Sequence, residues 1–209
     1  MLGLKHDVNL LVNYDPQWET DFIEERGRIS HALGVIAQGI EHYGSTAVKG
    51  MRAKPILDIM VGVAPFEDWQ KCKAPLERLG YDYAANAGVP RHHIFGRGRD
   101  STERTHLVHI VEFMGVSWRT DLVLRDALRA DPKLRDAYVR EKERAVAAAP
   151  KGRAKYNEQK QSFIFDMKAT LRGCLETAMG DLNPDNSMES ERSPIPGAFD
   201  VDPRDPGRA

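Results

Sequence analysis

Residues 40–63 read IEHYGSTAVKGMRAKPILDIMVGV, and this stretch sets the plan of the chain. We predict a strand end, a turn at Gly44–Ser45, a looped or short helical passage, and then a buried strand, because apolar residues dominate only the second half. Asp58 falls inside that second strand, where an ionised carboxylate costs free energy unless a cation or hydrogen-bond donors meet it. The charge at Asp58 therefore serves either a structural or a chemical purpose.

The 209 residues are 41% hydrophobic and 29% charged, which is typical of a globular protein with one sizeable core. No apolar run approaches the roughly 20 residues that a membrane span needs, and residues 1–14 lack the apolar block of a signal peptide. Cys72 and Cys174 lie far apart, which favours reduced thiols over a disulfide or a zinc site. These features predict a cytoplasmic protein without a membrane partner.

The net charge of −1 is spread unevenly along the chain. Residues 180–209 carry seven acidic and three basic side chains, a net charge of −4, so the rest of the chain carries +3. A surplus of that size is far below the basicity of a dedicated nucleic-acid binder, although it allows a local positive site for phosphates. The prolines and scattered acids of the tail predict disorder.

Strand and helix patterns alternate up to about residue 114, and helical patterns follow. We expect a strand at 8–14, a helix from the Asp15 N-cap to Gly34, a strand at 35–43, and a helix at 65–79 that Pro75 bends or breaks. Further strands are expected at 81–84, 92–96 and 104–113, with helices starting near residues 116, 131 and 154. This pattern predicts an α/β (or α+β) fold with one domain at 8–179: a mixed-sheet core at 8–114, a helical segment at 115–179 and the tail at 180–209.

The turn and the strand that follows it carry groups suited to phosphate chemistry. A Gly-Ser turn after a strand can present backbone amides and a hydroxyl to an anion, although such turns are common. Asp58 offers a carboxylate for a divalent metal, and Arg52 and Lys54 lie between the two. Together these groups are typical of phosphoryl transfer. No Ser-His-Asp order, cysteine pair or Walker-type glycine loop favours a hydrolase or a kinase.

Several short motifs are spread along the chain. They are the run from Glu41 to Ile59, Tyr14-Asp15-Pro16-Gln17-Trp18, Arg104-Thr105-His106 with His109, Leu124-Arg125-Asp126 with Leu128-Arg129, and Tyr156 with Lys160 and Phe163. The first of these resembles the pattern E-H-I-G-S-T-S/A-V-P-G-L-x-A-K-P-I-I-D-I of the GrpB family, and the others are similar to its remaining motifs. The resemblance covers about residues 8–178.

The resemblance implies a nucleotidyltransferase-like fold with a mixed sheet. In active members of that superfamily a Gly-Ser motif holds the nucleotide triphosphate. A D-x-D or D-x-E pair then holds two magnesium ions with a third carboxylate on a neighbouring strand. By this resemblance Gly44, Ser45 and Thr46 bind phosphate, and Asp58 is the catalytic residue and the first Mg²⁺ ligand.

The chain departs from that pattern at two positions. Met60 stands where the second carboxylate is expected, and a thioether is a poor ligand for a hard cation that prefers oxygen. Lys49 replaces the proline that is usual in the family. Glu112 and Asp121 are the candidates that would complete a metal site if either lay close to Asp58.

Four basic residues belong to the matched motifs. The resemblance implies that Lys54, Arg104 and Lys160 neutralise phosphate charge. Arg125 either lines the site or forms an internal ion pair with Asp126.

Three histidines are further site candidates. His42, at a strand end beside the turn, suits a ligand-contacting role as well as a structural one. His106 and His109 are three residues apart, so on a regular strand they face opposite sides of the sheet, which favours structural roles for the pair.

These observations lead to one principal hypothesis and two alternatives. The first is magnesium-assisted nucleotidyl transfer to an unknown small acceptor. The second is a non-catalytic protein that binds a nucleotide or another phosphorylated small molecule, which Met60 favours. The third is an interaction protein whose acidic tail recruits a partner.

Overall fold

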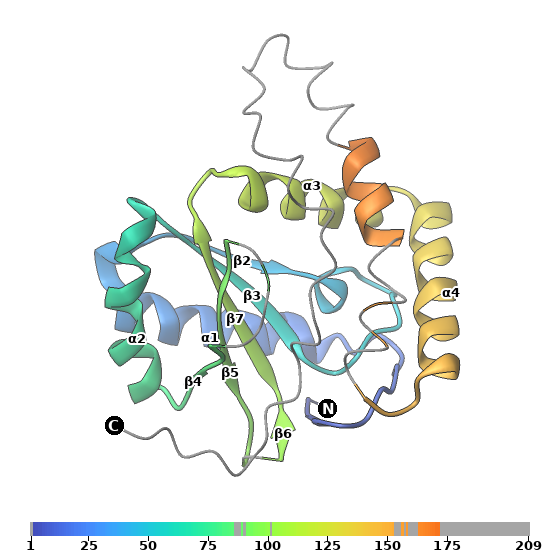
Figure 1. Cartoon of the computed structure of the whole chain (residues 1–209), viewed down its shortest axis with the longest axis horizontal. Coiled ribbons are helices and arrows are strands. Elements are labelled where there is room, and N and C mark those ends of the chain that lie inside the picture. The colour runs from blue at the N-terminus through green and yellow to red at the C-terminus, as the bar shows by residue number, and fades with distance from the viewer. Residues whose placement is uncertain are drawn as a thin grey trace, which may run out of the picture.

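The computed structural model describes residues 2–85, 89, 91–100, 102–152, 156, 158 and 163–171. A five-stranded sheet lies at its centre in the order β2-β3-β7-β5-β4 (Figure 1). The strands are β2 (Ala37–Tyr43), β3 (Leu57–Val63), β4 (Asp82–Tyr83), β5 (His93–Arg97) and β7 (His106–Glu112). Strands β3 and β7 run parallel, and the other neighbouring pairs are antiparallel. The predicted mixed α/β fold is confirmed.

Strand β3 separates two layers of the molecule. Because side chains alternate along a strand, Leu57, Ile59 and Val61 face one side, where they pack with residues of α1 (Gln17–Leu33) and α2 (Trp69–Arg78). All three are fully buried, and burying each contributes about 1.5–3 kcal/mol. Asp58 and Met60 face the opposite side, toward α3 (Val116–Ala130).

Two glycines let α3 approach the sheet. A Cβ at Gly39 would lie 2.7 Å from Cη2 of Trp118, and a Cβ at Gly62 would lie 2.7 Å from Cδ2 of Phe113. The two aromatic rings contact each other edge to face, with their centroids 5.1 Å apart. Any side chain at either glycine would therefore push the rings, and α3 with them, off the sheet.

Helix α4 (Pro132–Ala148) follows α3 after a single capping residue, and Figure 1 shows it standing at the right-hand side of the sheet. Oδ1 of Asp131 accepts hydrogen bonds from the backbone N–H groups of Lys133 (2.8 Å) and Leu134 (3.2 Å). The predicted helix start is thus confirmed. Residues 156, 158 and 163–171 are helical, whereas the other residues of the third predicted helix, Cys174 and the tail at 180–209 lie outside the described residues.

One predicted strand is wrong. Residues 8–14 form no strand, because Val8 bridges Lys151 and Val12 bridges Ala53, two partners that do not continue as one ladder. The helix predicted at 65–79 is confirmed as a 3₁₀ turn, η3 (Phe66–Asp68), followed directly by α2, and Pro75 does not break it.

The strand predicted at 104–113 also divides. Its first part is β6 (Glu103–Arg104), which pairs with β1 (Leu4–Lys5) in a separate two-stranded sheet. The second part is β7. Thr105 between them donates its backbone N–H to the Arg97 carbonyl, so the chain changes partners at this residue.

The N-terminal segment fastens the end of α4 to the core through Asn9. The Asn9 side-chain amide donates to the carbonyls of Ala149 (2.7 Å) and Gly152 (3.0 Å). Its Oδ1 accepts a hydrogen bond from Nζ of Lys54 at 2.6 Å. Asn9 is buried, so these hydrogen bonds replace those that its polar atoms would otherwise make with water.

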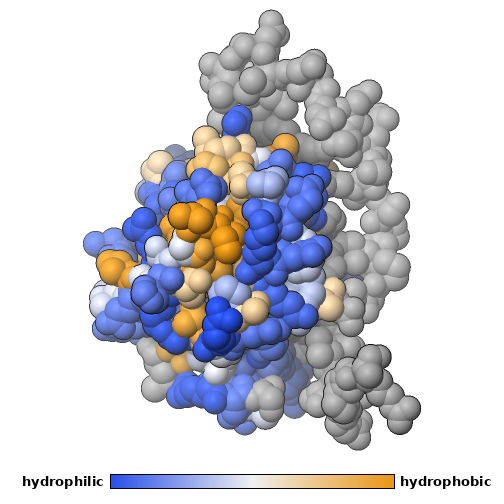
Figure 2. Space-filling model, turned by 90° about the vertical axis from the view of Figure 1, so that its left-hand side faces the viewer, coloured by the Kyte–Doolittle hydropathy of each residue, from blue (hydrophilic) through white to orange (hydrophobic). Residues whose placement is uncertain are grey.

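Figure 2 views the end of the sheet at which β2 begins and β3 finishes, and shows a group of apolar residues rimmed by hydrophilic ones. Exposed apolar side chains adjoin the strands at this end: Val35 before β2, and Met114 and Val116 after β7. The Gly44–Ser45 turn and Asp58 lie at the other end of β2 and β3. Within the described part of the chain, no helix has the length and hydropathy to cross a bilayer.

Candidate functional site

The Gly44 turn folds directly over Asp58. Gly44 has φ +68° and follows Tyr43, whose strand partner is Asp58. A Cβ at Gly44 would lie only 2.5 Å from Oδ2 of Asp58. Both the left-handed backbone and the close approach require glycine, and they place the start of the turn against the carboxylate that the sequence singled out.

A tyrosine from α4 completes the turn. The hydroxyls of Ser45, the first residue of η2 (Ser45–Ala47), and Tyr138 are hydrogen-bonded. Burial raises the pKa of Tyr138, the Ser45 bond opposes this rise, and the charges of Asp58 and Asp121 add to it. Tyr138 therefore stays a neutral phenol that links the helical layer to the turn.

Besides burial, the same two carboxylates also raise the pKa of Tyr43. Burial raises its pKa well above the usual value, and the charges of Asp58 and then Asp121 raise it further. Asp121 comes from α3, and Asp58 from β3. The two carboxylates thus act on the same pair of tyrosines, Tyr43 and Tyr138, from opposite layers.

The strand register shows which residues flank Asp58 on this face. Leu107 lies directly beside it on β7, and His109 lies beside Met60. Met60 is fully buried in an apolar cluster with Val111 and Trp118. The positions next to Asp58 along β3 and across to β7 therefore carry no carboxylate.

Glu112 and Asp121, the two carboxylates that could complete a metal site with Asp58, lie in different places. Glu112 pairs with Val63, five residues beyond the Asp58–Leu107 pair, which is roughly 17 Å along the strand. It forms an ion pair with Arg91 at 2.6 Å. Asp121 is buried and paired with Lys168, and Oδ2 lies 4.0 Å from Nε2 of His92.

The donor set does not fit a two-magnesium centre, which needs carboxylates that bridge both ions. Among the described residues, no group of three or more His, Cys, Asp or Glu side chains is arranged to hold a metal ion. Asp58 alone fits a single magnesium ion whose other ligands are water and the phosphates of a ligand.

The histidine candidates take three different positions. His42 lies on the far face of the sheet, stacked on Phe22, and its Nε2 is 3.0 Å from the Thr46 hydroxyl. Burial, aided by Arg129 and Arg125, lowers the pKa of His42 to about 3, so the ring is neutral. Since Thr46 is itself buried, this contact supports the turn from behind.

His106 and His109 lie on opposite faces of β7, as their spacing predicts. His109 shares the face of Asp58, where Nδ1 lies 3.3 Å from Nδ1 of His92. His106 faces α1. Burial and the charge of Arg97 lower its pKa to about 4.

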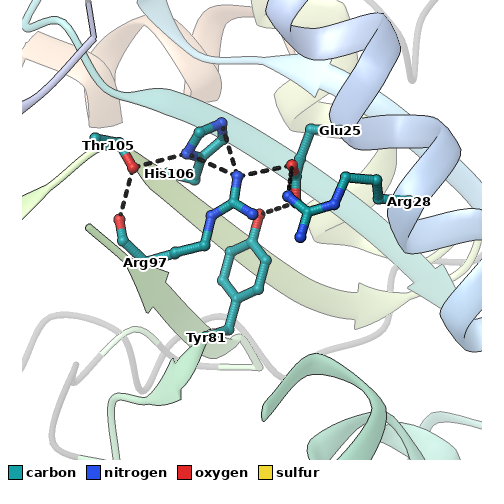
Figure 3. Close-up of polar contacts among 6 residues, drawn as sticks. All are labelled: Glu25, Arg28, Tyr81, Arg97, Thr105 and His106. Carbon is teal, nitrogen blue, oxygen red and sulfur yellow. Dashed lines mark hydrogen bonds and ion pairs between the residues drawn. The ribbon is translucent and has the colours of Figure 1, made fainter. Parts of the chain in front are cut away.

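Figure 3 shows the environment of His106, a polar network between α1 and the sheet. The guanidinium of Arg97 bonds to Glu25 at 2.7 Å and lies 3.3 Å from both ring nitrogens of His106. The Tyr81 hydroxyl donates to Glu25 at 2.8 Å, and Arg28 bonds to the same carboxylate at 2.9 Å. This network ties α1 to β5 and β7, which is a structural role.

The described basic residues of the matched motifs contact other parts of the fold. Arg125 donates to Glu41 (2.8 Å) and to the His42 carbonyl (3.0 Å), and it pairs with Asp126. Arg129, which the sequence did not single out, donates to the Ala47 carbonyl at 3.0 Å. These two arginines of α3 hold both ends of the turn.

Lys54 and Arg104 make other contacts. Lys54 bonds to Asn9, and Nζ is 3.5 Å from the centroid of the Tyr156 ring. Arg104 crosses Gly96, where a Cβ would meet Nε at 2.5 Å, and donates to Asp82 at 2.5 Å. Lys160 lies outside the described residues.

Sequence reasoning missed Tyr43, Tyr138, His92 and Lys168 as members of this site. Tyr138 sits on the apolar stripe of its helix, which reads as ordinary core. His92 precedes β5 and carries no motif of its own. The period of two along a strand puts Asp58 and Met60 on one face of β3, but it gives no sign of which helix covers that face.

Comparisons with known proteins agree on one family. The family model described as GrpB protein matches residues 9–170. The glutamate-rich protein GrpB of Alkalihalophilus pseudofirmus is 30% identical over 170 residues, which cover 80% of this chain and 98% of that protein. A UPF0157 protein of Pseudomonas aeruginosa is 35% identical over 152 residues, 72% of this chain and 62% of its own length.

Solved structures give the same result. The crystal structure of the conserved protein GrpB from Enterococcus faecalis aligns with a TM-score of 0.69 and 30% identity, covering 78% of this chain and 96% of that one. The Cid1 poly(U) polymerase aligns with a TM-score of 0.46 and 12% identity, too low to carry an inference. Matched over most of its length by the family model and by relatives in sequence and structure, the chain belongs to the GrpB family.

Proposed function

We propose that the chain binds a nucleotide, or another phosphorylated small molecule, at the Gly44–Ser45 turn beside Asp58. The observation that carries this proposal is the close approach of Gly44 to the Asp58 carboxylate. A Cβ at Gly44 would lie only 2.5 Å from Oδ2 of Asp58. It brings a hydroxyl-bearing turn and an acidic side chain together although 13 positions separate Ser45 from Asp58. A phosphate-binding turn and a cation-binding group are thus neighbours.

The charges set a condition on the ligand. A phosphate beside an ionised carboxylate is repelled unless a cation lies between them. Magnesium commonly binds one or two carboxylates together with substrate phosphates and water. Asp58 would hold such an ion, and the ion would offset the phosphate charge, so we expect binding to be magnesium-dependent.

Binding is favoured over two-magnesium transfer because Met60 and Leu107 flank Asp58 on its own face. Neither side chain offers an oxygen ligand. The absence of carboxylates from these two positions would weaken a mechanism in which paired ions hold both the attacking and the leaving oxygen.

Calorimetry tests the proposal directly. ATP and GTP are titrated into the protein with and without Mg²⁺, alongside Asp58→Asn, Ser45→Ala and Glu112→Gln. We expect Asp58→Asn to remove the magnesium-dependent part of the affinity and Ser45→Ala to weaken binding about fivefold, the worth of roughly one hydrogen bond. Glu112→Gln, at the other end of β7, should bind like wild type. The proposal fails if wild type binds neither nucleotide with or without magnesium.

Nucleotidyl transfer is the second candidate, and the position of Asp121 favours it. Asp121 acts on the same two tyrosines as Asp58, so α3 supplies a second carboxylate to this region. Incubation with labelled nucleoside triphosphates and a metabolite extract separates the two functions. Label transfer that Asp121→Asn abolishes would support catalysis, whereas nucleotide binding without transfer would support the binding function.

A further inference from the structure

A pair of histidines lies on the same face of the sheet as Asp58. His109 is on β7, and His92 immediately precedes β5, the neighbouring strand. Their Nδ1 atoms are 3.3 Å apart, with the ring planes at 89°. The side chain of His92 is only 8% exposed. Two imidazoles thus meet through their nitrogens in a largely buried place.

The separation of the two nitrogens matches the spacing of two ligands on one metal ion. Zinc binds imidazole nitrogen at about 2.0–2.1 Å in a tetrahedral arrangement, which places two ligand nitrogens about 3.3–3.4 Å apart. The observed 3.3 Å falls at that spacing. A bound ion would replace the hydrogen bond that joins these two Nδ1 atoms in the structure.

The opposite nitrogen of His92 also has a suitable neighbour. Nε2 of His92 lies 4.0 Å from Oδ2 of Asp121, a buried carboxylate. Histidine ligands commonly direct their second ring nitrogen at a carboxylate, which fixes the tautomer and the ring orientation. Lys168 bonds to the other oxygen of Asp121 and holds that carboxylate in place.

We propose that His92 and His109 form a binding site for one divalent ion of the zinc class, with Asp121 positioning His92. Imidazole ligands select zinc, nickel, cobalt or copper over magnesium. The site is separate in chemistry from the magnesium ion proposed at Asp58. It stands whether or not a nucleotide binds. Water or a ligand oxygen would complete the coordination.

The test uses protein without a histidine tag, freed of metal and titrated with Zn²⁺ by calorimetry, with Mg²⁺ as the comparison ion. Co²⁺ is titrated in parallel, because its visible absorption spectrum reports nitrogen ligands and coordination number. The variants are His92→Ala, His109→Ala and Asp121→Asn, and His31→Ala, an exposed histidine on α1, is the matched control.

We expect wild type and His31→Ala to bind one Zn²⁺ per chain and not to bind Mg²⁺ at this site. His92→Ala and His109→Ala should each lose at least tenfold in zinc affinity, and Asp121→Asn should lose about tenfold or more. Zn²⁺ should raise the melting temperature of wild type and not that of the His92→Ala, His109→Ala double variant. The proposal is overturned if wild type binds no zinc, or if the double variant binds it as tightly as wild type.

Discussion

Replacing Glu25 with alanine should destabilise the protein strongly, because it removes the centre of the network in Figure 3. Glu25 is 3% exposed and accepts bonds from Arg97, Arg28 and Tyr81. The variant leaves the guanidinium of Arg97, which is only 16% exposed, without its carboxylate. Removing one partner of a buried ion pair costs about 3–5 kcal/mol. The bond to Arg28 adds little, because that side chain is half exposed and screened by water.

Urea unfolding followed by circular dichroism measures this loss, with Glu24→Ala as the matched control on the exposed side of α1. Glu24→Ala should stay within about 0.5 kcal/mol of wild type. Adding Arg97→Ala to Glu25→Ala should cost less than the sum of the two single losses, because the pair is already broken. Equal unfolding midpoints for Glu25→Ala and Glu24→Ala would refute a stabilising role for the network.

The charge state of Glu25 gives the same variant a pH signature. Burial favours the neutral acid, but Arg97 and the hydrogen bond from Tyr81 outweigh it and lower the pKa of Glu25. A carboxylate with a lowered pKa stabilises the fold above its unfolded pKa, about 4.3, and this stabilisation is lost as the pH falls through the folded pKa. The acid-induced loss of stability below about pH 4.3 should therefore be smaller in Glu25→Ala than in wild type.

Three further predictions concern the turn, β3 and the buried histidines. Met60→Asp should lower the free energy of unfolding in urea by about 4 kcal/mol or more and confer no transferase activity, because it buries a carboxylate among apolar side chains. Met60→Leu should cost under about 1.5 kcal/mol, and a stable, active Met60→Asp protein would contradict the burial argument. Gly44→Ala should lose about 1–3 kcal/mol from backbone strain and the clash with Asp58, and should weaken nucleotide binding in the same titration; unchanged stability and binding would show that the close contact is dispensable. His42 and His106, with pKa values of about 3 and about 4, stay neutral in the fold, whereas the same histidines of the unfolded chain take up protons below about pH 6.5. The free energy of unfolding should therefore fall as the pH is lowered from about 6.5 toward 4. His106→Gln should make this fall less steep, and an unaltered pH dependence would count against the argument.

The run of apolar residues at 57–63 was enough to predict the central strand, and the period of two along a strand placed His106 and His109 on opposite faces. Local patterns failed where partners are distant in sequence. Residues 8–14 are apolar enough for a strand, yet their partners, Ala53 and Lys151, belong to two different parts of the chain. Tyr138 and Ser45 meet across 93 positions, and nothing in either local sequence specifies that contact. Packing between elements decides such contacts, and periodicity describes only one element at a time.

The Asn9 contacts also constrain the order in which the chain acquires its final form during synthesis. The last strand of the central sheet ends at Glu112, but the carbonyls that Asn9 binds belong to Ala149 and Gly152. At about 5–20 residues per second, a ribosome needs roughly 7–28 s to make the 140 positions that separate Asn9 from Ala149. The sheet can therefore assemble while Asn9 still lacks these two partners, and the end of α4 is fastened to the core only after Gly152 has been made.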